Sequence, residues 1–227
     1  MPSGIRTVLF DLDGTLLDTA PDLAAALNSV LMENHREPLP LEAIRPAVSH
    51  GGIAIIRRGF GLEAADPAIE PLRQRLLEHY RANICTHTRP FPGMSGVLES
   101  LEMRGLNWGV VTNKPGWLTT PLLTELGLLQ RAACVVSGDT LAQRKPDPAP
   151  MLHACALAGS EPHHCVYAGD ALRDVEAGNA AGMYTLVALF GYIQEHDRPY
   201  EWQADAMIDA PADLLAWLDN SEQRDII

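Results

Sequence analysis

Lysine and positive charge are scarce in this sequence. Only two lysines occur, Lys114 and Lys145, and the 17 basic residues are outnumbered by 29 acidic ones, which gives a formal net charge of −12. A chain this acidic repels nucleic acid and anionic membranes, so neither is an expected partner. An anionic substrate must then be attracted by local positive groups, and the two lysines are candidates for them.

Cysteine pairs and long apolar segments are also missing. The four cysteines have no CxxC spacing, which argues against a zinc site and a disulfide framework. No stretch approaches the roughly 20 apolar residues of a membrane span, and a strand-like segment begins near the N-terminus without a signal-peptide region before it. We therefore expect a cytoplasmic protein with free thiols at Cys85, Cys134, Cys155 and Cys165.

Two acidic residues follow the first predicted strand. Residues 7–10 are apolar or β-branched, and this run is too short for a helix but suits a buried strand. Asp11 and Asp13 come next, and Gly14-Thr15 indicates a tight exit loop. In an open α/β sheet this strand end faces the ligand crevice, where two carboxylates repel each other unless a cation offsets their charge. The alternative is a solvated, Asp-rich turn.

Residues 16–88 show helical periodicity and no convincing strand. Apolar positions at helical spacing predict helices over residues 20–34, 41–48, 53–60 and 68–83. The segment from Arg89 to Gly93 is typical of a linker. We therefore predict a small helical domain at residues 16–88, inserted into a core domain formed by residues 1–15 and 89–227.

Beyond the linker, predicted strands alternate with predicted helices. Strands are expected at residues 108–112, 134–137, 165–168, 185–188 and 206–208, and helices at 93–103, 115–126, 147–158, 172–181 and 212–218. Residues 219–227 are expected to fray. Alternation at this spacing predicts an α/β fold, a doubly wound parallel sheet with helices on both faces.

Polar residues follow several of these strands. Thr112-Asn113 ends one strand, Lys145 lies in a loop, and Asp170 and Asp174 follow another strand. Since the carboxyl ends of parallel strands share one edge, these groups should converge with the two acids of the first strand. Alternatively, Asp170 and Asp174 cap the following helix, and Lys145 is a solvated cation.

Four ordered motifs resemble those of haloacid dehalogenase superfamily phosphatases. They are Asp11-Leu12-Asp13-Gly14-Thr15, Val111-Thr112-Asn113, Lys145-Pro146-Asp147-Pro148 and Gly169-Asp170-x-x-x-Asp174. The resemblance covers nearly the whole chain. It implies a Rossmann-like core, with residues 16–88 as an inserted helical cap domain of the C1 type, and hydrolysis of a small phosphomonoester.

The resemblance also implies roles for the acidic residues. Asp11 would attack phosphorus and form an aspartyl-phosphate, and Asp13 would serve as general acid and base. A hard dication with oxygen ligands suits the two negative reactants. By resemblance this ion is Mg²⁺, bound by an Asp11 carboxylate oxygen, the Asp13 backbone carbonyl and the Asp170 side chain.

The remaining motif residues would act on the phosphoryl group. Thr112 and Asn113 can donate hydrogen bonds to its oxygens, and Lys145 can neutralise the nucleophile and the transferred group. Asp174 would hold a metal-bound water or orient Lys145. Lys114 follows the second motif and either meets the substrate or faces water.

The predicted cap would recognise the leaving group and exclude water. Ser49, His50 and the backbone of Gly51-Gly52 are candidate substrate contacts, and Arg57 or Arg58 could bind a substrate carboxylate. The alternatives are that His50 is a buried histidine and that the arginines form a solvated helix face.

Individual residues narrow the choice within the superfamily. Asp13 argues against a dehalogenase, and the lack of lysine in residues 16–88 excludes hydrolysis of a phosphonate through a lysine imine. The chain resembles the phosphoglycolate phosphatase branch but departs from it at residues 49–52. Its tail, with Phe190 to Ile193, is similar to that of N-acetylmuramic acid 6-phosphate phosphatases.

Three hypotheses follow from these observations. The first is a Mg²⁺-dependent phosphatase of carbohydrate metabolism, a monomer or homodimer, whose substrate is 2-phosphoglycolate, N-acetylmuramic acid 6-phosphate or a related phosphate. The second is a phosphomutase of the β-phosphoglucomutase type, which has the same core and cap. The third is a catalytically silent binding protein that keeps the metal pocket.

Overall fold

A six-stranded sheet forms the centre of the computed structural model, which describes residues 4–194 and 196–224. Its strands are β1 (Thr7–Phe10), β4 (Asn107–Val111), β5 (Cys134–Val136), β6 (Cys165–Gly169), β7 (Tyr184–Ala188) and β8 (Ala206–Ile208). Their order is β5-β4-β1-β6-β7-β8, and every neighbouring pair is parallel. β1 lies between β4 and β6, so the turn that follows β1 is near the middle of the sheet edge formed by the carboxyl ends of the strands.

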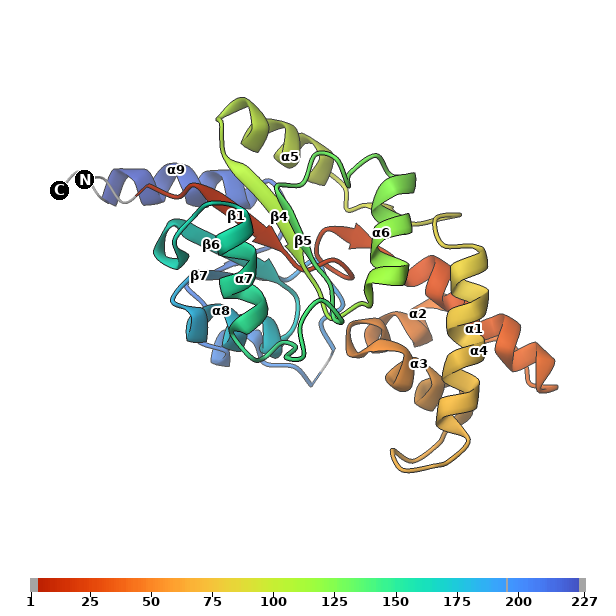
Figure 1. Ribbon diagram of the computed structural model, residues 1–227. Coiled ribbons are helices and arrows are strands. Elements are labelled where there is room, and N and C mark those ends of the chain that lie inside the picture. Colours follow the sequence, from red (N-terminus) through yellow and green to blue (C-terminus); the bar gives the residue numbers. More distant parts are fainter. Residues whose placement is uncertain (1–3, 195, 225–227) are drawn as a thin grey trace.

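Helices cover both faces of this sheet (Figure 1). They are α5 (Met94–Met103), α6 (Gly116–Glu125), α7 (Ala149–Leu157), α8 (Leu172–Ala181) and α9 (Asp213–Arg224), with short 3-10 helices η2 (Pro162–His164) and η3 (Pro199–Glu201). Alternate β1 residues belong to two apolar clusters: Val8 and Phe10 pack with α5, α6 and α9, whereas Leu9 packs with α7 and α8. The prediction of a doubly wound parallel α/β sheet is confirmed.

A group of helices interrupts the chain between β1 and β4. It contains α1 (Ala20–Glu33), α2 (Leu41–Ile44), η1 (Arg45–His50), α3 (Gly51–Phe60) and α4 (Ile69–Ala82), and it lies beyond the carboxyl ends of the strands (Figure 1). The chain enters and leaves this group through β2 (Leu17–Asp18) and β3 (Arg89–Pro90), which pair antiparallel. The prediction of no strand in residues 16–88 is therefore wrong for β2, which is too short to show alternation.

The middle of this helical group also differs from prediction. The sequence predicts one helix over residues 41–48, but α2 ends at Ile44 and the 3-10 helix η1 follows, with Pro46 near its start. Proline lacks the backbone N–H that would continue the α-helical pattern. Gly51, with φ of 80°, joins η1 directly to α3, so Ser49 and His50 end one helix where the next begins.

The last helix is longer than predicted. The sequence predicts fraying from Asp219, but α9 continues to Arg224. Leu214 and Leu218 are buried, and Arg104 Nη1 lies 2.6 Å from Asp219 Oδ1, so the helix is anchored beyond its apolar residues. Residues 225–227 of the predicted frayed segment lie outside the described residues.

The cysteines are free thiols, as predicted. Three of them are buried, and burial raises the pKa of Cys134 to about 11, which makes it an inert core residue. None of the helices in the described ranges combines the length and the apolar character that crossing a membrane requires.

Asp22 ties α1 to the segment that returns to the sheet. Its buried carboxylate accepts hydrogen bonds from His87 N at 2.9 Å, Thr88 N at 2.8 Å and Thr88 Oγ1 at 2.7 Å. We expect Asp22→Ala to lower the free energy of unfolding by about 3 kcal/mol, because buried donors lose a charged acceptor. Chemical denaturation measures the loss, and a value below about 1 kcal/mol would contradict the prediction. Glu42→Ala, at an exposed acid in the first turn of α2, should change it by less than about 0.5 kcal/mol.

Candidate active site

The turn after β1 presents Asp11 at the carboxyl edge of the sheet. The strand ends just before Asp11, so the backbone leaves extended geometry there, and Leu12 N donates a hydrogen bond to Asp11 Oδ1 at 2.8 Å. Gly14 has a φ of 89°, and a Cβ atom at this position would collide with the Asp170 carboxylate. The turn therefore needs glycine for its conformation and for the close approach of Asp170.

A buried lysine joins the acids of the first and fourth motifs. Lys145 Nζ lies 2.9 Å from Asp11 Oδ1 and 2.7 Å from Asp174 Oδ1, and the three side chains are almost inaccessible to solvent. The Tyr167 hydroxyl and the Val111 carbonyl accept from the same ammonium group at 2.8 and 3.1 Å. Lys145 is thus held in one position by four oxygen atoms.

Burial and charge oppose each other at these carboxylates. Burial raises the pKa of Asp11, but the charges of Lys145 and Arg173 outweigh this effect and leave its pKa below the usual value. At Asp174 burial dominates and raises the pKa. Asp11 is therefore kept ionised at neutral pH, which suits the predicted nucleophile.

Asp170 has one oxygen atom without a partner. Its Oδ2 accepts hydrogen bonds from Ser49 Oγ at 2.6 Å and Tyr192 N at 2.9 Å, whereas the buried Oδ1 has no hydrogen-bond partner among the described residues. Burial, together with the charges of Asp11 and Asp174, raises the pKa of Asp170 to about 7. A buried carboxylate oxygen without a donor is suited to a cation.

Three buried carboxylates form a candidate metal site. One oxygen atom each of Asp11, Asp170 and Asp174 lies within 4.8 Å of the others. These are the oxygen ligands that Mg²⁺ prefers, and the unpartnered Asp170 oxygen fits such an ion. Asp174 already accepts hydrogen bonds from Lys145 Nζ and Ala171 N, so Asp11 and Asp170 are the more available ligands.

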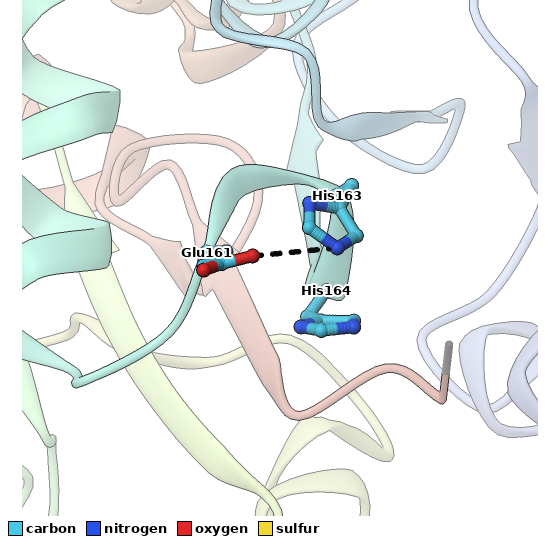
Figure 2. A group of neighbouring side chains, drawn as sticks. All are labelled: Glu161, His163 and His164. Carbon is cyan, nitrogen blue, oxygen red and sulfur yellow. Dashed lines mark ion pairs between the residues drawn. The ribbon is translucent and has the colours of Figure 1, made fainter. Parts of the chain in front are cut away.

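A second group of potential metal ligands lies away from this site. Figure 2 shows Glu161, His163 and His164 around η2, which precedes β6 and therefore lies at the amino end of that strand. His163 Nε2 is 3.5 Å from Glu161 Oε2, and both side chains are exposed. This group is at the opposite edge of the sheet from Asp11.

Asp13 forms an ion pair with Lys114. Asp13 Oδ1 accepts hydrogen bonds from Thr19 Oγ1 at 2.6 Å and Lys114 Nζ at 2.9 Å, and the same Nζ lies 4.5 Å from the centre of the Tyr80 ring. Burial lowers the pKa of Lys114, but Asp13 and Tyr80 outweigh it and hold the pKa above its usual value. Lys114, which the sequence leaves between substrate and water, therefore belongs to the site.

The second motif supports the lysine of the third. Asn113 Nδ2 donates to Lys145 O at 3.0 Å, and Lys145 N donates to Asn113 Oδ1 at 3.1 Å, so this side chain holds the lysine loop. Thr112 Oγ1 accepts a hydrogen bond from Lys114 N at 3.1 Å. The hydroxyl hydrogen of Thr112 is therefore available to donate a hydrogen bond to a ligand.

A cleft of about 1190 Å³ brings the motifs and the helical group together. Its lining includes motif residues from the sheet edge and four predicted cap contacts, namely Asp11, Asp13, Thr112 and Asn113 with Ser49, His50, Gly51 and Gly52. Arg173 Nη2 donates to Ser49 O at 2.8 Å, which ties η1 to α8 across the cleft. His50 is exposed, so the alternative of a buried histidine is wrong.

The structure does not place Arg57 or Arg58, the predicted carboxylate contacts, in the lining of the cleft. Arg57 is exposed, and its Nε donates to Leu62 O at 3.2 Å, while Arg58 Nε donates to Ala43 O at 2.7 Å. Neither lines the cleft, although Ile55 of the same helix does. Two residues along a helix correspond to a rotation of about 200°, so Arg57 points to another face.

Besides Tyr167, Thr19 and Tyr80, other residues contact the site without having been predicted. Arg173 Nη2 lies 3.9 Å from Asp11 Oδ2, and Tyr192 N binds Asp170. Arg173 precedes Asp174 within the fourth motif, so its place in the sequence was a usable signal. Tyr192 lies in the segment after β7, where no pattern indicates a contact with Asp170.

Lys145 is expected to be essential for stability as well as for the site. Lys145→Met keeps the length of the side chain but removes the cation in direct contact with the buried Asp11 and Asp174, which should cost about 3–5 kcal/mol of unfolding free energy. Arg104→Met removes an exposed ion pair with Asp219 and should cost less than about 1 kcal/mol. Equal losses in thermal or chemical denaturation would contradict the prediction.

Comparisons with known proteins agree with the motifs. The model of the family described as haloacid dehalogenase-like hydrolase matches residues 8–188. A phosphoglycolate phosphatase of Xylella fastidiosa is 47% identical over 207 residues, covering 91% of this chain and 90% of the relative. An N-acetylmuramic acid 6-phosphate phosphatase of Pseudomonas aeruginosa is 40% identical over 217 residues, covering 96% of each chain.

Solved structures agree with this assignment. A crystal structure described as a predicted phosphoglycolate phosphatase from Haemophilus somnus is similar with a TM-score of 0.82 and 27% identity, covering 94% of this chain and 97% of the other. The resemblance drawn from the four motifs is confirmed by the family match. The chain belongs to the haloacid dehalogenase-like hydrolase family and is a phosphatase.

Proposed function

We propose that this phosphatase hydrolyses a small phosphomonoester in two steps through an aspartyl-phosphate at Asp11, with Mg²⁺ as cofactor. The environment of Asp11 carries the proposal. Its Oδ1 is bound by Leu12 N and Lys145 Nζ, whereas no hydrogen bond reaches Oδ2 from the part of the chain that the structure describes. Oδ2 is therefore available to attack phosphorus.

Asp11 and Asp13 divide the chemistry between them. Asp11 Oδ2 forms a bond to phosphorus while the bond from phosphorus to the ester oxygen breaks, and Asp13 gives its proton to the departing alkoxide. Asp13 then accepts a proton from water, whose oxygen attacks phosphorus and releases phosphate and the Asp11 carboxylate. Thr19 and Lys114 hold Asp13 toward the cleft for both transfers.

Cations and donors of the chain stabilise the transferred group. Lys145 lies beside Asp11, and Thr112 and Asn113 border the same cleft. They offset charge that spreads over the phosphoryl oxygens in the transition state. Asp174 positions Lys145 through the 2.7 Å contact between Oδ1 and Nζ.

The metal would be held by Asp11, Asp170 and the Asp13 backbone carbonyl. The unpartnered Asp170 Oδ1 supports this choice, since it is a buried oxygen that no donor of the described chain satisfies. When bound, Mg²⁺ supplies positive charge between the nucleophile and the phosphoryl oxygens. Ser49 and Tyr192 N orient the Asp170 carboxylate for that purpose.

Residues 16–88 act as a cap domain in this proposal, and residues 1–15 with 89–227 form the catalytic core. Ser49 to Gly52 would recognise the leaving group, because they border the same cleft as Asp11. The relatives act on 2-phosphoglycolate or N-acetylmuramic acid 6-phosphate, so a phosphorylated organic acid is the proposed substrate. A cytoplasmic location and a monomeric or homodimeric state stay predictions.

Metal removal provides the direct test. In EDTA, the rate of phosphate release from 2-phosphoglycolate, N-acetylmuramic acid 6-phosphate and acetyl phosphate should fall by at least about 10³-fold, because without the metal the carboxylates of Asp11 and its neighbours repel the anionic substrate. Excess Mg²⁺ should restore the rate. Ca²⁺ controls for simple charge, since its coordination is larger and looser. Full activity in EDTA, or an isomerised sugar phosphate in place of free phosphate, would overturn the proposal.

A further inference from the structure

The cleft continues beyond the residues that the reaction needs. Its lining also includes Trp117 of α6 and Arg144 of the lysine loop, together with Gln74, Leu77 and Arg81 of α4. Arg144 precedes Lys145, and Trp117 follows Lys114 by three residues. Trp117 and Arg144 are thus close in sequence to the two lysines of the site.

Two cations of the cleft are free to bind an anion. Arg73 is occupied by Glu70, Lys114 by Asp13, and Arg173 by Ser49 O. Arg81 and Arg144 are exposed, and within the described ranges neither forms an ion pair or a side-chain hydrogen bond. An arginine without a partner presents a planar donor pair that matches a carboxylate.

Trp117 presents an apolar surface to the same cleft. It lies in the first turn of α6 and is 48% exposed, while the opposite face of this helix is buried through Leu118 and Leu122. The start of α6 is fixed by the hydrogen bond from Gly116 N to Asp139 Oδ1 at 2.7 Å. A fixed, half-exposed indole can stack against the apolar face of a ring.

We propose that Trp117 and Arg144 form the leaving-group subsite, and that its ligand is a ring-sized phosphorylated acid, such as a sugar acid. Arg144 would bind the carboxylate and Trp117 the ring. A two-carbon acid has a carboxylate but no ring for Trp117 to cover, and a cleft of about 1190 Å³ exceeds what it needs. This inference rests on the proposed function and adds a choice between its two substrate classes.

Four substrates separate the two contacts. N-acetylmuramic acid 6-phosphate has ring and carboxylate, N-acetylglucosamine 6-phosphate has the ring alone, 2-phosphoglycolate has the carboxylate alone, and acetyl phosphate has neither. In Trp117→Ala, the kcat/KM for N-acetylmuramic acid 6-phosphate relative to 2-phosphoglycolate should fall at least about tenfold. In Arg144→Gln, the kcat/KM for N-acetylmuramic acid 6-phosphate relative to N-acetylglucosamine 6-phosphate should fall by a similar factor. Trp117→Phe should restore most of the first ratio, and Arg144→Lys only part of the second.

The controls and outcomes decide between the two proposals. Tyr200→Ala and Arg104→Gln remove an exposed aromatic residue and an exposed arginine outside the cleft, and should leave both ratios unchanged. Unchanged ratios in Trp117→Ala and Arg144→Gln, or a wild-type enzyme that prefers 2-phosphoglycolate, would overturn the subsite while leaving the phosphatase proposal intact. No turnover of any of the four with Mg²⁺ would overturn both. Circular dichroism checks that each variant is folded.

Discussion

Asp11→Asn is expected to lower phosphate release by at least about 10⁴-fold. The substitution keeps the size of the side chain but removes the negative charge on Oδ2, the oxygen to which the described chain provides no hydrogen bond. Steady-state kinetics with Mg²⁺ and any accepted phosphomonoester measures the loss. Rapid quenching with radiolabelled substrate should trap a hydroxylamine-sensitive phosphoenzyme in the wild type and none in the variant.

The fold should survive this change. The neutral amide of the variant would relieve the repulsion among the buried acids Asp11, Asp170 and Asp174, which the raised pKa of Asp170 already reflects. It also removes the ion pair with Lys145, which keeps Asp174 as its partner, so we expect the metal-free variant to stay folded but to unfold below the wild-type temperature. Asp219→Asn is the matched control, because this exposed carboxylate is paired with Arg104 and does not line the cleft. A rate within tenfold of wild type for Asp11→Asn would exclude Asp11 as the nucleophile.

Regular elements of the fold could be predicted because each has a strong local signal. β1, β6 and β7 are short apolar runs, and the alternation of β6 and β7 with α7 and α8 indicates a parallel sheet. β2 has only two residues and forms through pairing with β3, more than 70 residues away, so it has no local signal. The end of α9 likewise depends on a tertiary contact, the ion pair between Arg104 and Asp219.

Core site residues could be predicted because they follow strands whose carboxyl ends share one edge. Asp11, Lys145 and Asp174 meet within hydrogen-bonding distance for this reason. The contacts from the helical group are a different case. Ser49 reaches Asp170 across 121 residues of sequence, and whether an arginine of α3 faces the cleft depends on how that helix packs. The local sequence therefore does not show that Arg57 lies outside the lining of the cleft.

The contact between Ser49 and Asp170 joins the helical group, which contains Ser49, to the sheet edge, which carries the carboxylates of the site. Ser49 Oγ donates to Asp170 Oδ2, and Ser49 O accepts from Arg173, which faces Asp11. A residue at the junction of η1 and α3 thus bonds to the predicted metal ligand and to the neighbour of the predicted nucleophile. The position of the helical group is therefore coupled to the orientation of the Asp170 carboxylate and of Arg173 through the side chain and the carbonyl of Ser49.

Asp13→Asn should separate the two chemical steps. The amide can neither protonate the alkoxide nor accept a proton from water, so kcat for a sugar phosphate should fall by about 10²–10⁴-fold. With p-nitrophenyl phosphate the leaving group needs no proton, and formation of the aspartyl-phosphate stays fast while its hydrolysis lacks a base. Stopped-flow absorbance should then show a burst of one nitrophenolate per active site, followed by slow turnover.

The burst distinguishes proton transfer from support of the site. Thr19→Val removes the 2.6 Å hydrogen bond to Asp13 Oδ1 but keeps the carboxylate, so it should slow both steps by about tenfold or less and give no burst. If Asp13→Asn loses the same factor with sugar phosphate and nitrophenyl phosphate and shows no burst, Asp13 serves mainly to hold Lys114. If the burst appears with nitrophenyl phosphate but not with a sugar phosphate, the same carboxylate gives a proton in the first step and takes one in the second, because only the ester with a basic leaving group then loses its fast first step.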